Sequence, residues 1–260
     1  MTEIGRWGDV TAVCGDDHVA VVEMHRPPNN FFDQKLISEL ADAFEACDAD
    51  DACRSLLLCS EGKHFCAGAN FATRGGGLAT DSGRHLYEEA VRLFSTRKPV
   101  VAAVQGAAVG GGLGLSLMAD FRVASEDARF SANFARLGIH HGFGMTVTLP
   151  AVVGQQKCME LLYLGRRLRA TDAWDIGLCD RVVAPGELRE RAHGMAAEIA
   201  SSAPLAVESI RETFRGDLAE RIAVATARER QEQERLQRSA DFAEGVRAMS
   251  ERRPPRFTRS

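Results

Sequence analysis

Four glycines near the middle of the chain have the type and spacing to hold a charged group. Gly110, Gly111 and Gly112 stand in a row and Gly114 follows one residue later, between the apolar runs PVVAAV and LSLMA. A bare turn between a strand and a helix leaves backbone N–H groups accessible at the helix start, where the helix dipole favours negative charge. The turn therefore predicts an oxyanion site made of backbone. A close crossing of strand and helix without a ligand is the alternative.

Other well-known sites do not fit this turn. A phosphate-binding P-loop needs Gly-Lys-Ser/Thr, whereas Leu113 and Gly114 follow here. The dinucleotide spacing G-x-G-x-x-G is absent from the turn, and the chain has neither a G-x-S-x-G nucleophile elbow nor an H-E-x-x-H zinc helix. The seven cysteines include no C-x-x-C pair, so the sequence predicts no metal site and no disulfide framework.

The elements around the turn alternate between strands and helices. Residues 10–25 alternate in polarity and contain a GDD turn, which is typical of a hairpin. Asp33 can cap a helix whose apolar residues repeat from Leu36 to Cys47. SLLLCS and PVVAAV are short apolar runs that favour buried strands, and a helix is expected to end near residue 95. This order indicates an α/β protein with helical crossovers.

Two other stretches differ from this alternation. Residues 72–83 are small and glycine-rich, which predicts a mobile segment. From about residue 186 the sequence is helical and charged, without a strand signal. We therefore predict a core at residues 1–185 and a C-terminal helical subdomain at residues 186–260.

Composition and charge limit the function classes. The 260 residues are 45% hydrophobic and 26% charged, as in a soluble globular protein, and the net charge of −4 gives no support to nucleic-acid binding. The segment MTEIGRWGDV has no basic start followed by an apolar stretch, so we expect no signal peptide, and no run of about 18 apolar residues predicts a membrane helix. The odd number of cysteines suits a reducing compartment, so we expect a cytoplasmic protein.

A second segment indicates a family. GKHFCAGANF, followed by KPVVAAVQGAAVGGGLGLSLMADFRVASEDARF, resembles the crotonase superfamily, also called the enoyl-CoA hydratase/isomerase family. The resemblance extends over nearly the whole chain, through RPPNNFFD, LGRRLRATDAWDIGLCDRVV and the ending MSERRPPRFTRS. It implies an α/β, crotonase-like spiral of ββα turns with a C-terminal helical trimerisation region. Self-association as a homotrimer or a dimer of trimers is implied as well.

The resemblance also implies a substrate and a site. Family members bind an acyl-CoA and stabilise the thioester enolate with two backbone N–H groups, which by position would be those of Ala67 and Gly111. Coenzyme A enters as part of the substrate, and neither a permanently bound cofactor nor a metal is implied. The implied substrate-binding residues are Phe65, Gly68, Ala69, Asn70, Tyr87, Gly110, Phe134 and Phe257.

The chain departs from the family where proton transfer takes place. Members that hydrate enoyl thioesters use two glutamates, and the matching positions here hold Gly114 and Phe134, the latter within the pair Asn133-Phe134. No Asp or Glu occurs at residues 90–119 or 128–159, so a shifted alignment does not restore them. The nucleophilic aspartate of the related aryl-CoA dehalogenase is also missing, because its position is Gly142.

Other side chains could transfer a proton instead. His140 and His141 lie beside the second missing carboxylate, and histidine titrates near neutral pH. Tyr87 and Glu88 lie on a helix that can face the acyl pocket in this family. Each histidine could equally cap a loop or contact CoA phosphates.

Several functions remain open on the sequence alone. The first is an acyl-CoA enzyme of the lyase or isomerase type in fatty acid metabolism, with altered catalytic residues. Thioester hydrolysis, decarboxylation or C–C cleavage with His140 or His141 is an alternative reaction. A non-catalytic acyl-CoA-binding homologue and an oligomeric scaffold are the alternatives from other classes.

Overall fold

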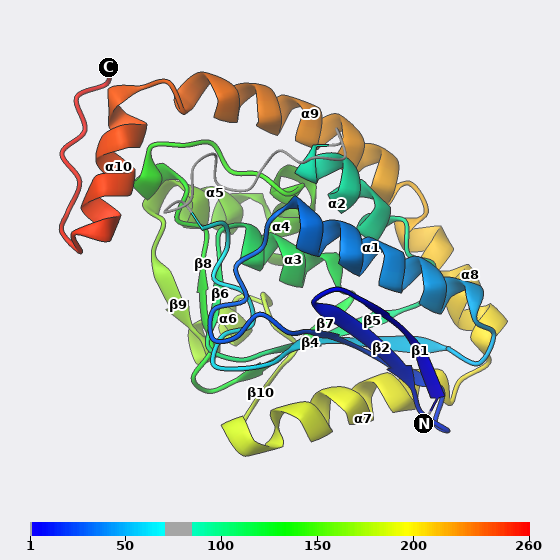
Figure 1. Cartoon of the computed structure of the whole chain (residues 1–260). Coiled ribbons are helices and arrows are strands. Elements are labelled where there is room, and N and C mark those ends of the chain that lie inside the picture. The colour runs from blue at the N-terminus through cyan, green and yellow to red at the C-terminus, as the bar shows by residue number, and fades with distance from the viewer. Residues whose placement is uncertain (1, 71–84) are drawn as a thin grey trace.

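The computed structural model describes residues 2–70 and 85–260, and within them a seven-stranded sheet lies at the centre (Figure 1). Its strand order is β1-β2-β3-β4-β5-β7-β10. The strands are β1 (Thr2–Trp7), β2 (Val10–Cys14), β3 (Val19–Met24), β4 (Ser55–Ser60), β5 (Val100–Val104), β7 (Phe121–Ser125) and β10 (Arg181–Val183). The pairs β1–β2 and β2–β3 are antiparallel, and from β3 onwards the neighbouring strands are parallel.

A second, smaller sheet has three strands. It has the order β6-β8-β9, with β6 (Ala107–Val109), β8 (Arg129–Ser131) and β9 (Arg167–Arg169). β6 and β8 are parallel and place Val109 opposite Ser131. The chain segments that follow these two strands therefore emerge side by side.

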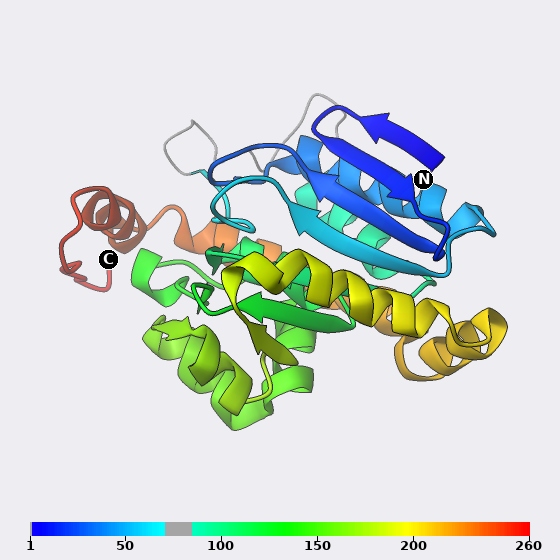
Figure 2. The same ribbon diagram turned by 90° about the horizontal axis from the view of Figure 1, so that it is seen from below.

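Helices cover both faces of the large sheet. The helices are α1 (Gln34–Ala49), α2 (Leu86–Phe94), α3 (Gly111–Met118), α4 (Met145–Val153), α5 (Gln155–Leu164), α6 (Ala170–Asp175), α7 (Leu188–Ala200), α8 (Pro204–Arg215), α9 (Leu218–Leu236) and α10 (Ala240–Ser250), with short 3-10 turns at Ala135–Leu137 and Pro185–Glu187. Helices α1, α2 and α3 lie on one face and α7 on the other, as Figures 1 and 2 show from two sides. The predicted α/β architecture is confirmed.

Local sequence explains the first helix. The Asp33 carboxylate accepts a hydrogen bond of 2.9 Å from the Leu36 N–H, which is the N-cap interaction expected from the sequence. One face of α1 is buried against the sheet, including Leu36, Leu40 and Phe44. The predicted hairpin is present as β2 and β3, but β1 was not predicted. Three of its six residues are exposed and three are half-buried, without the alternation that marks β2.

The C-terminal part is helical, as predicted, yet its first helix packs on the sheet. Leu188, Ala192 and Ala196 of α7 share a buried cluster with Leu57 and Val101. The division into residues 1–185 and 186–260 stays a prediction, and α7 belongs by its contacts to the sheet. The predicted mobile segment, residues 72–83, lies outside the described residues.

Helix α8 is attached by ion pairs, whereas α7 is attached by apolar packing. Arg211 and Arg215 of α8 form ion pairs with Asp120 at the end of α3, and Arg211 Nε lies 3.0 Å from an Asp120 carboxylate oxygen. Burial opposes ionisation of Asp120, but the two arginines hold the pKa of its carboxyl below the usual value. No helix among the described residues is long and apolar enough to span a membrane.

Candidate functional site

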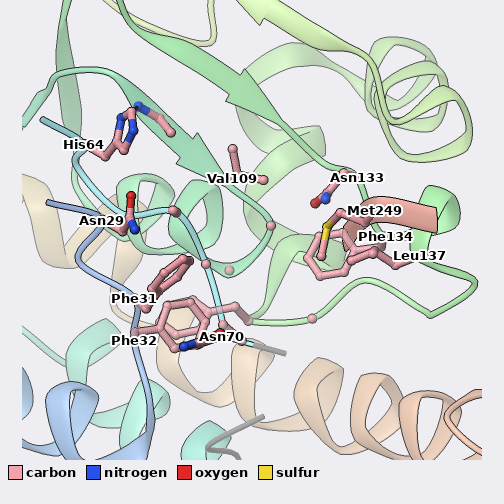
Figure 3. Close-up of a pocket in the computed structure, with 18 of the residues that line it drawn as sticks. Asn29, Phe31, Phe32, His64, Asn70, Val109, Asn133, Phe134, Leu137 and Met249 are labelled. Carbon is pink, nitrogen blue, oxygen red and sulfur yellow. Dashed lines mark hydrogen bonds between the residues drawn. The ribbon is translucent and has the colours of Figure 1, made fainter. Parts of the chain in front are cut away.

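A cavity of about 720 Å³ opens between the small sheet, the loop at residues 63–70 and helix α10. Figure 3 shows Phe31, Phe32 and His64 on one side of it and Phe134, Leu137 and Met249 on the other. Cavities of this size suit a small-molecule ligand. The sequence-predicted residues that line it are Gly68, Ala69, Asn70, Tyr87, Gly110, Gly111, Phe134 and Ala67.

The glycine turn forms part of this lining. Helix α3 begins at Gly111 without a side-chain cap, and Gly110 has a φ of 56°, which favours glycine. The Gly110 N–H donates to Ser131 O at 2.8 Å, which fastens the turn to β8. Among the described residues, no hydrogen bond uses the N–H of Gly111. That N–H is therefore available at the start of the helix.

The loop opposite the turn corrects one sequence prediction. The Ala67 N–H donates to Asn29 O at 2.9 Å, so it is already engaged and is not a free donor. The N–H of Ala69 takes part in no hydrogen bond within the described residues. A Cβ built on Gly68 would lie 3.8 Å from the Gly111 nitrogen, so this loop and the turn are neighbours. Among the described residues the available donors are therefore the N–H groups of Ala69 and Gly111. Ala69 lies two residues after the expected donor, Ala67.

The cavity has a charged end and an apolar end. Lys63, His64, Asp127 and Arg129 line it near Gly106, which precedes β6. Phe32, Phe134, Leu137 and Phe143 line it near Gly111, which follows β6. The strand between them separates the two ends by roughly 10 Å. A ligand that fits must be charged at one end and apolar at the other.

His64 has a defined tautomer at the charged end. Its Nδ1 accepts the Ala107 N–H at 3.0 Å, so the ring proton of the neutral form is on Nε2. Burial and, secondarily, Lys63 lower the pKa of His64, which favours that neutral form. Asp127 accepts a hydrogen bond from Ser125 Oγ and is the one carboxylate among the described lining residues.

Aromatic rings fill the wall where the family's glutamates would lie. A Cβ on Gly114 would lie 2.8 Å from Phe143 Cβ, so a side chain at this position would require Phe143 to move. Phe143 is buried and packs on Phe32 and Phe94, with ring centroids 5.6 Å and 6.2 Å away. Phe134 lines the cavity at the second position. The absence of both carboxylates is thus accompanied by an apolar wall.

The two adjacent histidines do not reach this cavity. Neither His140 nor His141 is among the described lining residues. His140 Nδ1 lies 2.8 Å from His141 O, and His141 Nε2 lies 2.9 Å from Thr146 Oγ1. Burial and the neighbouring His140 ring lower the pKa of His141 to about 4, so at neutral pH it is uncharged. The structure does not bring the predicted histidine acid/base to this cavity.

Tyr87 closes the apolar end with a partner that the sequence did not indicate. Its hydroxyl donates to Gln233 Oε1 at 2.7 Å, and Gln233 Nε2 donates to His140 O at 2.9 Å. A Cβ on Gly142 would lie 1.9 Å from the Tyr87 hydroxyl oxygen, so a side chain there is excluded while Tyr87 holds this position. Burial raises the pKa of Tyr87. It therefore stays protonated at neutral pH.

Helix α9 supplies a second unexpected residue, Glu229. Its carboxylate is fully buried and accepts from Gly144 N at 2.9 Å, Thr146 N at 3.0 Å and Thr146 Oγ1 at 2.6 Å. His141 Nε2 lies 3.8 Å from it. The segment RERQEQER has the composition of a solvated helix face, so only the packing of α9 identifies Glu229 and Gln233, one turn apart, as supports of the loop at residues 140–146.

Two other predicted substrate-binding residues lie away from the cavity. The Phe65 side chain does not line the cavity, because its ring is fully buried in the hydrophobic core. The Phe65 N–H donates to Gln105 O. Phe257 is 42% exposed on the C-terminal tail and is not a lining residue either. The tail follows α10, where Asp241 accepts from Thr258 N at 2.6 Å. Contact of Phe257 with a ligand bound to a neighbouring subunit stays a prediction.

Comparison with known proteins identifies the family. Residues 15–260 match the family model for enoyl-CoA hydratase/isomerase. The chain is 32% identical to a probable enoyl-CoA hydratase of Bacillus subtilis over 250 residues, covering 93% of this chain and 96% of that protein. It is 33% identical to 1,2-epoxyphenylacetyl-CoA isomerase of Escherichia coli over 248 residues, with 92% and 95% covered.

Solved structures show the same architecture. An enoyl-CoA hydratase/isomerase from Pseudoalteromonas atlantica superposes with a TM-score of 0.87 at 30% identity, covering 96% of this chain and all of that one. An enoyl-CoA hydratase from Mycobacterium avium gives a TM-score of 0.84 at 27% identity, with 97% and 100% covered. The crotonase-like fold is confirmed. Fold, glycine turn and sequence together establish that the chain belongs to the enoyl-CoA hydratase/isomerase family.

Proposed function

We propose that the chain is an acyl-CoA enzyme that stabilises a thioester oxyanion with the N–H groups of Ala69 and Gly111. The observation that carries this proposal is a pair of backbone N–H groups that line one cavity from neighbouring segments and have no acceptor among the described residues. Preorganised N–H groups of this kind lower the energy of an oxygen that gains negative charge during the reaction. The coarser assignment, an enzyme of this family, rests on the comparisons.

The two unlike ends of the cavity support an acyl-CoA as the ligand. Lys63 and Arg129 at one end supply cations for phosphate groups, and His64 supplies an N–H donor. The phenylalanines at the other end suit an apolar or aromatic acyl group. A thioester held between them would place its carbonyl oxygen near the glycine turn.

The side chains of the apolar end favour a reaction that needs no carboxylate pair. Hydration of an enoyl thioester requires activation of water and delivery of a proton, and Phe143 and Phe134 occupy the places of the groups that would do this. Decarboxylation and C–C cleavage also pass through an oxyanion and need less help from an acid or base, whereas thioester hydrolysis needs an activated water, as hydration does. Tyr87, which stays protonated, is the ionisable lining residue at this end. Its hydroxyl is positioned by Gln233.

A non-catalytic acyl-CoA-binding protein is the second candidate. The filled wall around Phe143 favours it, because an apolar pocket without proton-transfer groups can bind a thioester and leave it unchanged. The two candidates share the ligand and differ in turnover alone.

Self-association is part of the proposal, as a homotrimer or a dimer of trimers. Leu205 and Phe214 of α8 are 80% and 78% exposed, and Val224 of α9 is 72% exposed. Large apolar side chains gathered on exposed helices are typical of an interface. Light scattering coupled to size-exclusion chromatography measures the mass in solution, and a monomer would contradict the proposal.

The experiment on function pairs calorimetry with turnover. The full chain is titrated with free CoA and with butyryl-CoA, and release of CoA, release of CO₂ and hydration of crotonyl-CoA are then assayed with a panel of thioesters. The proposal expects binding of the thioester and turnover of a substrate other than crotonyl-CoA. Binding without any turnover would favour the second candidate. Absence of affinity for either probe would contradict both, and efficient hydration of crotonyl-CoA would contradict the assigned role of the apolar wall.

A further inference from the structure

Asn133 reaches the cavity from the strand that runs beside the glycine turn. In the parallel pair β6–β8, Ala107 lies opposite Arg129 and Val109 opposite Ser131. Continuing this register by two residues brings Asn133 beside Gly111. Neighbouring strands lie about 4.8 Å apart, so a side chain at residue 133 is within reach of a group bound at the turn. The Gly110–Ser131 hydrogen bond of 2.8 Å fixes this arrangement.

The Asn133 amide points into the cavity and has no hydrogen-bond partner in the part of the chain that the structure describes. Figure 3 shows its carboxamide directed toward the cavity interior. A Cβ on Gly110 would lie 3.4 Å from Asn133 Oδ1, so the amide oxygen lies directly beside the turn. Within the described residues no hydrogen bond of any kind uses the Asn133 side chain. The position is half-buried, so water can solvate the amide until a ligand fills the cavity.

Most side chains on this side of the cavity are apolar, although Arg167 of the neighbouring strand β9 also lines it. Phe134, Leu137 and Met249 line the same side of the cavity. An acyl group that fills the space would remove water from the Asn133 amide without offering a hydrogen bond, unless the acyl group carries an oxygen of its own. An unpaired buried amide is costly, whereas a paired one is not. A site with such a group rejects ligands that lack the partner.

We propose that Asn133 is a specificity-determining residue that selects acyl-CoAs bearing a hydroxyl or oxo oxygen on the acyl carbons next to the thioester. The inference rests on the proposed function, because it assumes that the thioester oxygen lies at Ala69 and Gly111. With the carbonyl there, the next carbons of the acyl chain pass the Asn133 amide. Oδ1 accepts from a hydroxyl and Nδ2 donates to either oxygen.

Calorimetry with three probes of matched length tests the inference. The full chain is titrated with butyryl-CoA, 3-hydroxybutyryl-CoA and acetoacetyl-CoA. The expected result is that one or both oxygenated probes bind about tenfold or more tightly than butyryl-CoA. In Asn133→Leu, which has a similar volume and no polar atom, this preference disappears, because butyryl-CoA no longer buries an unpaired amide and the oxygenated probes lose their hydrogen bond. Ala135→Leu is the matched control, since it adds a leucine at an exposed position two residues away and keeps the preference.

Each outcome separates this inference from the proposed function. Equal affinity of the unmodified chain for all three probes would overturn the role of Asn133 and leave the proposed function intact. A preference that persists in Asn133→Leu would overturn it as well. Absence of affinity for any of the three probes would overturn the proposed function and, with it, this inference. If Asn133→Leu does not fold, Asn133→Ser, which keeps a shorter polar group, is expected to bind the oxygenated probes less tightly with unchanged affinity for butyryl-CoA.

Discussion

The two walls of the cavity are built from different parts of the chain. The wall at Ala69 and Gly111 offers backbone N–H groups, which depend on the path of the chain and not on side-chain identity. The wall at Phe134 and Phe143 consists of side chains, and Phe143 occupies the space that a side chain at Gly114 would need. A fold can therefore keep its oxyanion donors while its proton-transfer groups are replaced. In our proposal the backbone wall stabilises the oxyanion, and the side-chain wall limits which reactions can follow.

The largest effect is expected from the backbone wall. In Gly111→Ala the new methyl group would lie 2.1 Å from Phe32 Cζ, so the turn or the ring must move and the Gly111 N–H changes direction. We expect kcat/KM for the chain's own thioester to fall about a hundred- to a thousandfold, as for loss of an oxyanion donor. Gly194→Ala is the matched control, since no atom lies within 4 Å of a Cβ there. Equal activity of both variants would contradict the role of the turn.

The side-chain wall is tested by restoring a carboxylate. Gly114→Glu would place its Cβ 2.8 Å from Phe143 Cβ, so we expect overpacking that lowers the free energy of unfolding by about 1–3 kcal/mol. Urea denaturation measures this loss. Phe134→Glu, at a residue that lines the cavity, is expected to lower the free energy of unfolding by less. A stable Gly114→Glu variant that hydrates crotonyl-CoA would show that the wall is not closed to a glutamate.

The loop that carries Phe143 depends on the buried Glu229. Glu229→Gln keeps the size of the side chain but replaces one acceptor oxygen with an NH₂ group that faces the N–H donors of Gly144 and Thr146. We expect the free energy of unfolding to fall by about 1–3 kcal/mol. Glu234→Gln is the control on the same helix, with a side chain that is 53% exposed. Equal urea midpoints for the two variants would contradict this account of the loop.

His141 makes the stability of the protein depend on pH. Its pKa is about 4 in the folded chain and about 6.5 in the unfolded one, so between these values only the unfolded chain takes up the proton. We therefore expect His141 to reduce the free energy of unfolding as the pH falls from 6.5 to 4, by up to about 1.4 kcal/mol per pH unit, and to have no further effect below pH 4. Denaturation of the unmodified chain and of His141→Asn over this range measures it. An unchanged slope in His141→Asn would refute the assignment.

The smallest effect, on kcat, is expected from replacing His140 or His141 with alanine. His140→Ala and His141→Ala leave the cavity lining untouched, since neither residue belongs to it among the described residues. We expect kcat to stay within about threefold of the unmodified chain for each variant, measured at neutral pH. A hundredfold loss of kcat in a variant of unchanged stability would return the histidines to the acid/base role that their sequence position indicates.

The sequence predicted what depends on local pattern and on the family resemblance. The hairpin β2–β3, the Asp33 cap of α1 and the glycine turn before α3 are all confirmed. The predicted donor Ala67 is wrong because motif position cannot reveal which N–H of a loop pairs with a distant carbonyl. That the Asn29 carbonyl takes the Ala67 N–H is visible only in three dimensions.

Residues on the charged helix α9 were missed for a similar reason. Glu229 and Gln233 look like solvated residues in the sequence, and only the packing of α9 against the loop at residues 140–146 buries them. Asn133 was noted solely as the neighbour of a missing glutamate. Its place beside Gly111 follows from the register of β6 and β8, two short strands that sequence patterns did not indicate.

The most direct test of the central claim is a crystal structure of the chain with butyryl-CoA bound. The account predicts that the thioester oxygen lies within about 3.2 Å of the backbone nitrogens of Ala69 and Gly111, while the Ala67 N–H keeps its bond to Asn29 O. It also predicts that no carboxylate oxygen contacts the acyl carbons. A thioester oxygen bound elsewhere, or an Asp or Glu side chain beside the acyl carbons, would contradict it.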